Sequence, residues 1–145
     1  MHVSQILERK GDAVATTTPD ATVADLVKIL KEKKIGAVVI VDADGGLEGI
    51  VSERDVVRGL PDHGAELMNM RVDSIMTRDV KTCSPDDAAD QVMMQMSTHR
   101  FRHMPVARDG ALCGIVSIGD VVKCRLEELE AESGMLREYI GGGFG

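Results

Sequence analysis

The sequence predicts an α/β fold of the α+β kind, in which one β-α-β-β-α unit occurs twice, with an extended helix at the carboxyl end. Residues 41–57 and 106–122 agree at 11 of 17 positions without a gap, which indicates a tandem duplication. Apolar residues recur at helical spacing before each of these segments, and an Asp-Gly turn divides each segment into two β-rich runs. One unit is too small to bury both faces of its sheet, so we expect the copies to pack sheet to sheet with pseudo-two-fold symmetry.

The elements follow the same order in both copies. A short strand is expected at residues 13–17 and again at 80–83, and a helix follows each strand. The Asp-Gly pairs at 44–45 and 109–110 are typical hairpin turns, and a second helix should begin at Ser52 and at Ser117. The apolar face of the first helix in each copy consists of Val23, Leu26, Val27 and Leu30, and of Ala89, Val92, Met93 and Met96.

These elements divide the chain into a first domain at 1–62, a linker at 63–71, a second domain at 72–130, and a helical extension with a frayed tail at 131–145. Residues 61–71 are compatible with a flexible hinge and with a short helix. The final helix is expected to continue after Asp120, because apolar or small residues keep a spacing of four and three. This apolar line requires either a contact with another subunit or packing against its own domain. It consists of Val122, Leu126, Leu129, Ser133, Leu136 and Ile140.

Composition narrows the classes of function. A net charge of -7, a pI near 5.0 and only three aromatic residues argue against nucleic acid as a partner. No apolar run is long enough to span a membrane, and the first residues lack the features of a secretory signal. The three cysteines form no C-x-x-C pair, so neither a disulfide framework nor a zinc site is indicated. We expect a cytoplasmic protein that contacts no membrane.

The duplicated motif reads "GIVSERD" at 49–55 and "GIVSIGD" at 114–120. One interpretation is structural, because a serine followed three residues later by an acidic residue forms a capping box at a helix start. The other is functional, because backbone N–H groups, a hydroxyl and a carboxylate then meet at a helix amino terminus. A helix end favours phosphate, and an aspartate can accept hydrogen bonds from both hydroxyls of a ribose. The two interpretations are compatible.

With this motif twice, the segment "FRHMPV" at 101–106 and this order of elements, residues 1–130 resemble a tandem pair of CBS (cystathionine β-synthase) domains, also called a Bateman module. The resemblance implies a stand-alone regulatory module, not an enzyme. Paired CBS domains bind adenine nucleotides such as AMP, ADP, ATP, NAD(H) or S-adenosylmethionine in the clefts between the copies. It further implies a homodimer that signals energy status, through ligand occupancy, to a regulated protein in trans, with no catalytic cofactor.

The resemblance also assigns roles to individual positions. Asp55 and Asp120 would hold ribose hydroxyls, and Ser52 and Ser117 would lie near ribose or phosphate. Arg102 falls where the family often has a phosphate-binding residue, and Arg54 could compensate for Ala37 at the matching position of the first copy. The short first strands, whose backbone would read the adenine edge, contribute Thr16, Thr17, Lys81 and Thr82. The remaining positions assigned to the ligand are His103, Met104, Pro105 and Gly119.

Two alternatives to the sensor hypothesis follow from the residues. In the first, the chain is a structural or interaction module whose motif only caps helices while the terminal helix mediates assembly. In the second, it is an enzyme acting on nucleotides, but the sequence has no "GK[ST]" loop and no activated nucleophile. His99 and His103 have the spacing of a helical metal pair, yet Pro105 and the repeat place His103 in or beside a strand, so no metal site is predicted.

Overall fold

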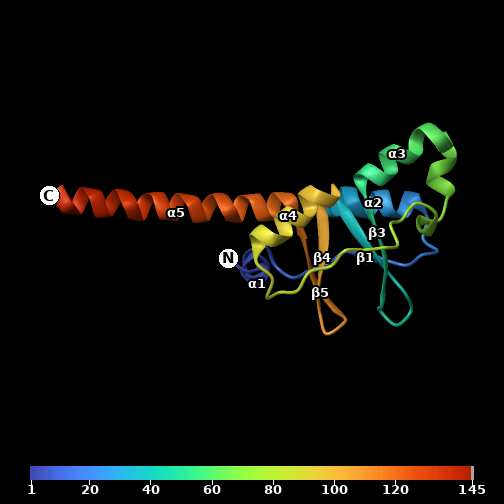
Figure 1. Ribbon diagram of the computed structural model, residues 1–145. Helices are drawn as coiled ribbons and strands as arrows, with labels where there is room; N and C mark the ends of the chain where they lie inside the picture. The colour runs from blue at the N-terminus through green and yellow to red at the C-terminus, as the bar shows by residue number, and fades with distance from the viewer. Residues whose placement is uncertain (145) are drawn as a thin grey trace.

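The computed structural model describes the backbone of residues 1–144 and the side chains of residues 1–134 (Figure 1). The first unit contains β1 (Thr16–Thr17), α2 (Val23–Lys33), β2 (Ala37–Val41), β3 (Leu47–Ser52) and α3 (Glu53–His63). The second contains α4 (Ala89–His99), β4 (His103–Arg108), β5 (Ala111–Ser117) and α5 (Ile118–Phe144). Before the first unit lies α1 (Val3–Lys10), and the two 3-10 helices η1 (Gly64–Asn69) and η2 (Val72–Ser74) join the units. The predicted α/β class and the order of the repeated elements are confirmed.

The first strand of the second unit differs from the prediction. In the first unit β1 runs parallel to β2, and the Val39 amide donates to the Ala15 carbonyl at 3.0 Å. In the second unit the expected strand is reduced to a single bridge between Cys83 and Val106. Pro105 occupies the place of Val39, because these two residues pair with the equivalent residues Ile115 and Ile50. Proline has no N–H to donate, so one ladder bond is missing and the strand does not extend.

The segments before each unit exchange places. Val3 and Ile6 of α1 lie in the hydrophobic core of the second unit, with Met96 and Met104. Conversely, Val72 of η2 lies in the core of the first unit. Backbone hydrogen bonds show the same exchange: the Val3 amide donates to the backbone carbonyl of Asp87, and the Val72 amide donates to the backbone carbonyl of Ala21. The two units are therefore interlocked by the chain that enters each of them.

The structure decides between the alternatives that the sequence left open for the linker and for the last helix. Helix α3 continues through Pro61 to His63 and η1 follows directly, so residues 61–69 are helical rather than an irregular hinge. Helix α5 extends far beyond both units (Figure 1). The side chains of Val122, Leu126 and Leu129 are exposed. The alternative that the apolar line of α5 packs against its own domain is therefore wrong for these three residues. The side chains of Leu136 and Ile140 and the final Gly145 lie outside the described residues. Within the described chain, no helix has the length and apolarity needed to cross a bilayer.

Candidate functional site

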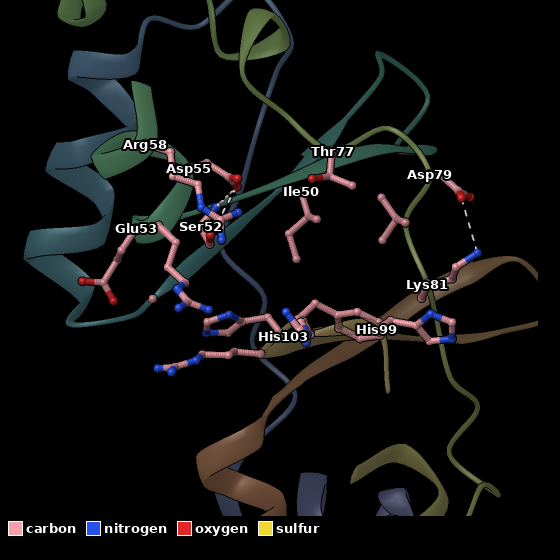
Figure 2. A pocket seen from close by; sticks show the side chains of 16 residues that line it. Ile50, Ser52, Glu53, Asp55, Arg58, Thr77, Asp79, Lys81, His99 and His103 are labelled. Carbon is pink, nitrogen blue, oxygen red and sulfur yellow. Dashed lines mark hydrogen bonds and ion pairs between the residues drawn. The ribbon is translucent and has the colours of Figure 1, made fainter. Parts of the chain in front are cut away.

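A cavity of about 440 Å³ opens between the two units (Figure 2). The first unit contributes the end of β3 and the first turns of α3, including Ser52 and Asp55. The second unit contributes the loop between α4 and β4, and the chain that joins the units crosses the cavity at residues 77 and 79–81. Residues far apart in the sequence thus form one site. The lining comprises Gly36, Ile50, Ser52, Glu53, Arg54, Asp55, Arg58, Thr77, Asp79, Val80, Lys81, His99, Arg100, Phe101, Arg102 and His103.

The first motif caps a helix and also presents a carboxylate to the cavity. The Ser52 amide donates to Asp55 Oδ2 at 2.8 Å, and the Ser52 hydroxyl lies 3.2 Å from the same oxygen. Both contacts use Oδ2, so Oδ1 of Asp55 has no hydrogen-bond partner among the described residues. Figure 2 shows Ser52 and Asp55 on one wall, with His103 and His99 along the opposite wall. The geometry supports capping and leaves one carboxylate oxygen available.

Positive charge collects around this cavity although the whole chain is acidic. Lys81 pairs with Asp79 at 3.3 Å. The four lining arginines have no carboxylate partner within 4.0 Å in the part of the chain that the structure describes; they are Arg54, Arg58, Arg100 and Arg102. Guanidinium groups without a carboxylate partner are well suited to an anion such as phosphate.

His103 lies at the contact between the two units. A Cβ added to Gly36 would lie 2.9 Å from His103 Nε2 and 3.0 Å from Glu53 Oε1, so only glycine allows the ring to come this close. Burial lowers the pKa of His103, and the positive charges of Lys10 and Arg102 lower it further. The carboxylates of Glu53 and Asp120 oppose this shift without reversing it. Its half-buried position between charges from both motifs therefore favours the neutral form of His103.

The second motif has the same local geometry in different surroundings. The Ser117 amide donates to Asp120 Oδ2 at 2.8 Å, and the Asp120 amide donates to the Ser117 hydroxyl at 3.1 Å. Lys10 Nζ lies 2.6 Å from the same Asp120 oxygen. Burial would raise the pKa of Asp120, but the hydrogen bonds from Lys10 and Ser117 outweigh it and hold this pKa below its ordinary value. Ser117, Gly119 and Asp120 do not line the cavity beside Asp55.

The structure brings together six of the predicted ligand residues and separates the others from them. The six are Ser52, Arg54, Asp55, Lys81, Arg102 and His103. Thr16 and Thr17 pair with β2, and Thr82 is exposed outside the cavity lining. The Met104 side chain is fully buried in the core, and the Pro105 carbonyl accepts from the Cys83 amide, so neither lines the cavity.

The repeat register needs one correction. Ala37 pairs with Ser52 and His103 pairs with Ser117, so the counterpart of Arg102 is Gly36 rather than Ala37. The ungapped alignment concealed this offset because the second hairpin loop is one residue shorter than the first. Arg58 and Thr77 also line the cavity, although the sequence did not predict them as site residues. Arg100 belongs to the basic segment "HRFRHMP" at 99–105, whose concentration of positive charge favours an anion. Arg58 stands three residues after Asp55, one helical turn along α3, and this spacing was the available signal.

The environment of Cys83 does not favour nucleophilic chemistry. Burial raises the pKa of the Cys83 thiol to about 12, and the nearby Asp87 and Cys113 act in the same direction. A thiol with so high a pKa is protonated at neutral pH and is a poor nucleophile. Among residues 1–134, no group of three or more His, Cys, Asp or Glu side chains is arranged to hold a metal ion.

Comparison with known proteins identifies the family. A sequence profile of the CBS domain matches residues 3–62 and again residues 72–127. A mitochondrial CBS domain-containing protein of Arabidopsis thaliana, CBSX3, is 35% identical over 98% of this chain and 73% of its own length. This chain belongs to the CBS-domain family.

Two solved structures share the fold. The crystal structure of a CBS-domain containing protein from Agrobacterium tumefaciens superposes with a TM-score of 0.84, at 44% identity, over 86% of this chain and 99% of that one. The CBS domain pair of protein MJ0100 was solved in complex with 5'-methylthioadenosine and S-adenosyl-L-methionine. It superposes with a TM-score of 0.79, at 27% identity, over 88% of this chain and 98% of that one. The chain is thus a CBS-domain pair, and one related pair binds adenosyl ligands.

Proposed function

We propose that the chain is a regulatory module, without catalytic activity, that binds an adenine nucleotide in the cavity beside Asp55. The observation that carries this proposal is the cavity itself, which is lined both by Asp55, whose Oδ1 is open, and by arginines that have no carboxylate partner among the described residues. An aspartate at a helix start can accept hydrogen bonds from ribose hydroxyls, while arginines bind phosphate. The two ends of a nucleotide thus each have a matching group.

The cavity also contains groups suited to the base. Ile50, Val80 and Phe101 provide apolar surface against which a purine ring can pack. The Lys81 carbonyl lacks the strand partner of its counterpart Ala15, because Pro105 has no N–H. This carbonyl is available to accept a hydrogen bond from the adenine amino group. A volume of about 440 Å³ is within the usual range of ligand pockets.

The proposal is tested by thermal unfolding in the presence of AMP, ADP, ATP, NAD, NADH and S-adenosylmethionine. A ligand that binds only the folded state stabilises it by about 2.7 kcal/mol at 100 times its Kd, which raises Tm by several degrees. We expect Asp55→Ala to abolish the increase produced by the ligand that binds. If none of these compounds raises the Tm of a cooperatively unfolding protein, the proposal is wrong.

A matched control separates ligand binding from helix capping. Asp25 holds the same third position in α2, where its carboxylate accepts from the Thr22 amide at 3.4 Å, but it does not line the cavity. Both Asp55→Ala and Asp25→Ala should lower the stability of the free protein, each by about 1 kcal/mol. Only Asp55→Ala should remove the ligand-induced increase in Tm. An equal loss in both variants would attribute the effect to the cap.

We extend the proposal to signalling. A ligand between the two units contacts both, so its binding favours one relative orientation of the units over others. The change would reach a regulated protein in trans, and the population shift requires different ligand affinities in the two orientations. The interaction-module alternative predicts unchanged assembly and no nucleotide affinity, which the same titration distinguishes.

The chain is also proposed to form a homodimer through α3 and α5. Five large apolar side chains on these helices are 41% to 63% exposed: Val57, Leu60, Val122, Leu126 and Leu129. Both helices begin at a copy of the same motif, and Val57 of the first copy corresponds to Val122 of the second. Similar apolar positions on two related helices suit a self-complementary interface with a second copy.

A further inference from the structure

The two motifs differ in the chain segment that approaches them. Met76 fills the space beside Gly49, and Leu7 fills the equivalent space beside Gly114, so these residues are counterparts. After Met76 the chain is extended, and Thr77 exchanges two backbone hydrogen bonds of 3.0 Å with Ile50. After Leu7 the chain instead remains helical to Lys10. Lys10 is therefore the counterpart of Asp79 in the sequence, but the helix brings its side chain to the Ile115 carbonyl and to Asp120.

Lys10 pairs with the carboxylate that corresponds to Asp55 in the second cleft. It shares Oδ2 of Asp120 with the Ser117 amide, so Oδ1 has no hydrogen-bond partner among the described residues. Its ammonium lies 2.6 Å from Asp120 Oδ2 and 3.0 Å from the Ile115 carbonyl. In the first cleft the corresponding Ile50 carbonyl is bonded by the Thr77 amide. Asp55 has no cation within 4.0 Å among the described residues, whereas the side chains of Lys10 and Asp120 are only 32% and 26% exposed. The salt bridge is thus partly shielded from solvent.

Helix α1 is held firmly where Lys10 makes this contact. Val3 and Ile6 are buried in the second core. Arg9 forms an ion pair with Glu127 of α5, and the ammonium of Met1 lies 3.0 Å from Glu128. A cavity of about 110 Å³ between α1 and α5 is lined by Lys10, Asp120 and Glu127. Moving Lys10 away would therefore break its salt bridge while the rest of α1 stays anchored.

We propose that Lys10 closes the Asp120 cleft by acting as an internal cation, so that the chain binds nucleotide only beside Asp55. This inference rests on the proposed function, since it determines how many nucleotides each chain takes. A nucleotide at Asp120 must compete with an ammonium group that is covalently part of the protein. The duplicated motif therefore gives one binding cleft and one structural ion pair.

The test is the number of ATP molecules bound per chain, measured by equilibrium dialysis and isothermal titration calorimetry. We expect one site in the wild type, none in Asp55→Ala and two in Lys10→Met. The second site should disappear again in Lys10→Met combined with Asp120→Ala. Lys10→Gln, which keeps an N–H donor for the Ile115 carbonyl, should behave like Lys10→Met and provides a second variant if the first folds poorly.

Arg9→Met is the matched control, because it removes the same charge from the same helix but breaks only the ion pair with Glu127. It should bind one ATP. Two ATP sites in the wild type, or no second site in either folded Lys10 variant, would overturn the inference. Weaker binding in both Lys10 variants would instead make Lys10 a phosphate ligand and also overturn it.

Failure of the proposed function has a different result. No ATP on the wild type with one ATP on Lys10→Met would refute the Asp55 site while supporting the role of Lys10. Absence of ATP from the wild type and from both Lys10 variants would contradict the role of Lys10, and it would contradict the proposed function as well if none of the other five compounds raises Tm.

Discussion

Replacing Gly49 by alanine should destabilise the protein more than the same change at Gly114, although both glycines begin a copy of one motif. A Cβ on Gly49 would lie 2.6 Å from Met76 Sδ and 2.9 Å from the Thr77 carbonyl oxygen. The three atoms nearest to a Cβ on Gly114 all belong to the Leu7 side chain, with Cδ2 at 2.7 Å and Cδ1 at 2.9 Å. The added Cβ would thus press on the Thr77 backbone as well as a side chain at Gly49, but on a side chain at Gly114.

The mobility of the neighbours sets the magnitude. The Thr77 backbone is fixed by two 3.0 Å hydrogen bonds to Ile50, so it cannot move away without breaking them. Overpacking against fixed atoms costs about 1–3 kcal/mol, while replacing glycine by alanine returns about 0.5–1 kcal/mol through the unfolded chain. The net loss for Gly49→Ala is therefore between about 0 and 2.5 kcal/mol, with about 1.3 kcal/mol at the centre of the two ranges. Leu7 can change rotamer, so Gly114→Ala should lose less than about 1 kcal/mol.

Urea unfolding of the two variants and the wild type, followed by circular dichroism, measures these differences. The slope of the transition should stay the same, so that a change in midpoint reports stability. If Gly49→Ala is as stable as Gly114→Ala, the Thr77 segment is not held against β3 and the reasoning is refuted. Because Ile50 and Thr77 line the cavity, Gly49→Ala should also weaken nucleotide binding.

Two further predictions concern His103 and the dimer. In the folded protein the pKa of His103 is lower than the value of about 6.5 expected for the unfolded chain, so the folded state binds a proton at His103 less readily. The contribution of His103 to folding stability is therefore complete above about pH 6.5 and is lost as the pH falls through the lower pKa of the folded state. The urea midpoint at pH 7.5 should exceed the midpoint at about pH 5.5, and this difference should be smaller in His103→Gln than in the wild type. Equal differences in the two proteins would exclude His103 as the cause. Analytical ultracentrifugation should show a dimer for the wild type and a monomer for the double variant Val57→Asp with Val122→Asp. A dimer in the double variant would place the interface elsewhere.

Much of the fold could be predicted because its signals are local. The periodicity of α2 and α4, the hairpin turns and the Ser-Asp capping boxes each depend on residues a few positions apart. The duplicated motif also located Ser52 and Asp55 at a helix start. The shortened strand before α4 was missed, although Pro105 carried the signal: a proline removes a donor wherever a partner strand needs one.

Only the tertiary structure shows which chain segment lies opposite each copy of the motif. The sequence alone establishes two equal copies, and nothing in "GIVSERD" or "GIVSIGD" distinguishes an open cleft from a closed one. The difference arises because α1 crosses to the second unit and stays helical to Lys10, whereas the chain after Met76 is extended beside β3. Such contacts join residues more than 100 positions apart, such as Lys10 and Asp120, and depend on the path of the whole chain. Local patterns fix the elements, and the path between them determines that Asp55 faces a cavity while Asp120 faces a lysine.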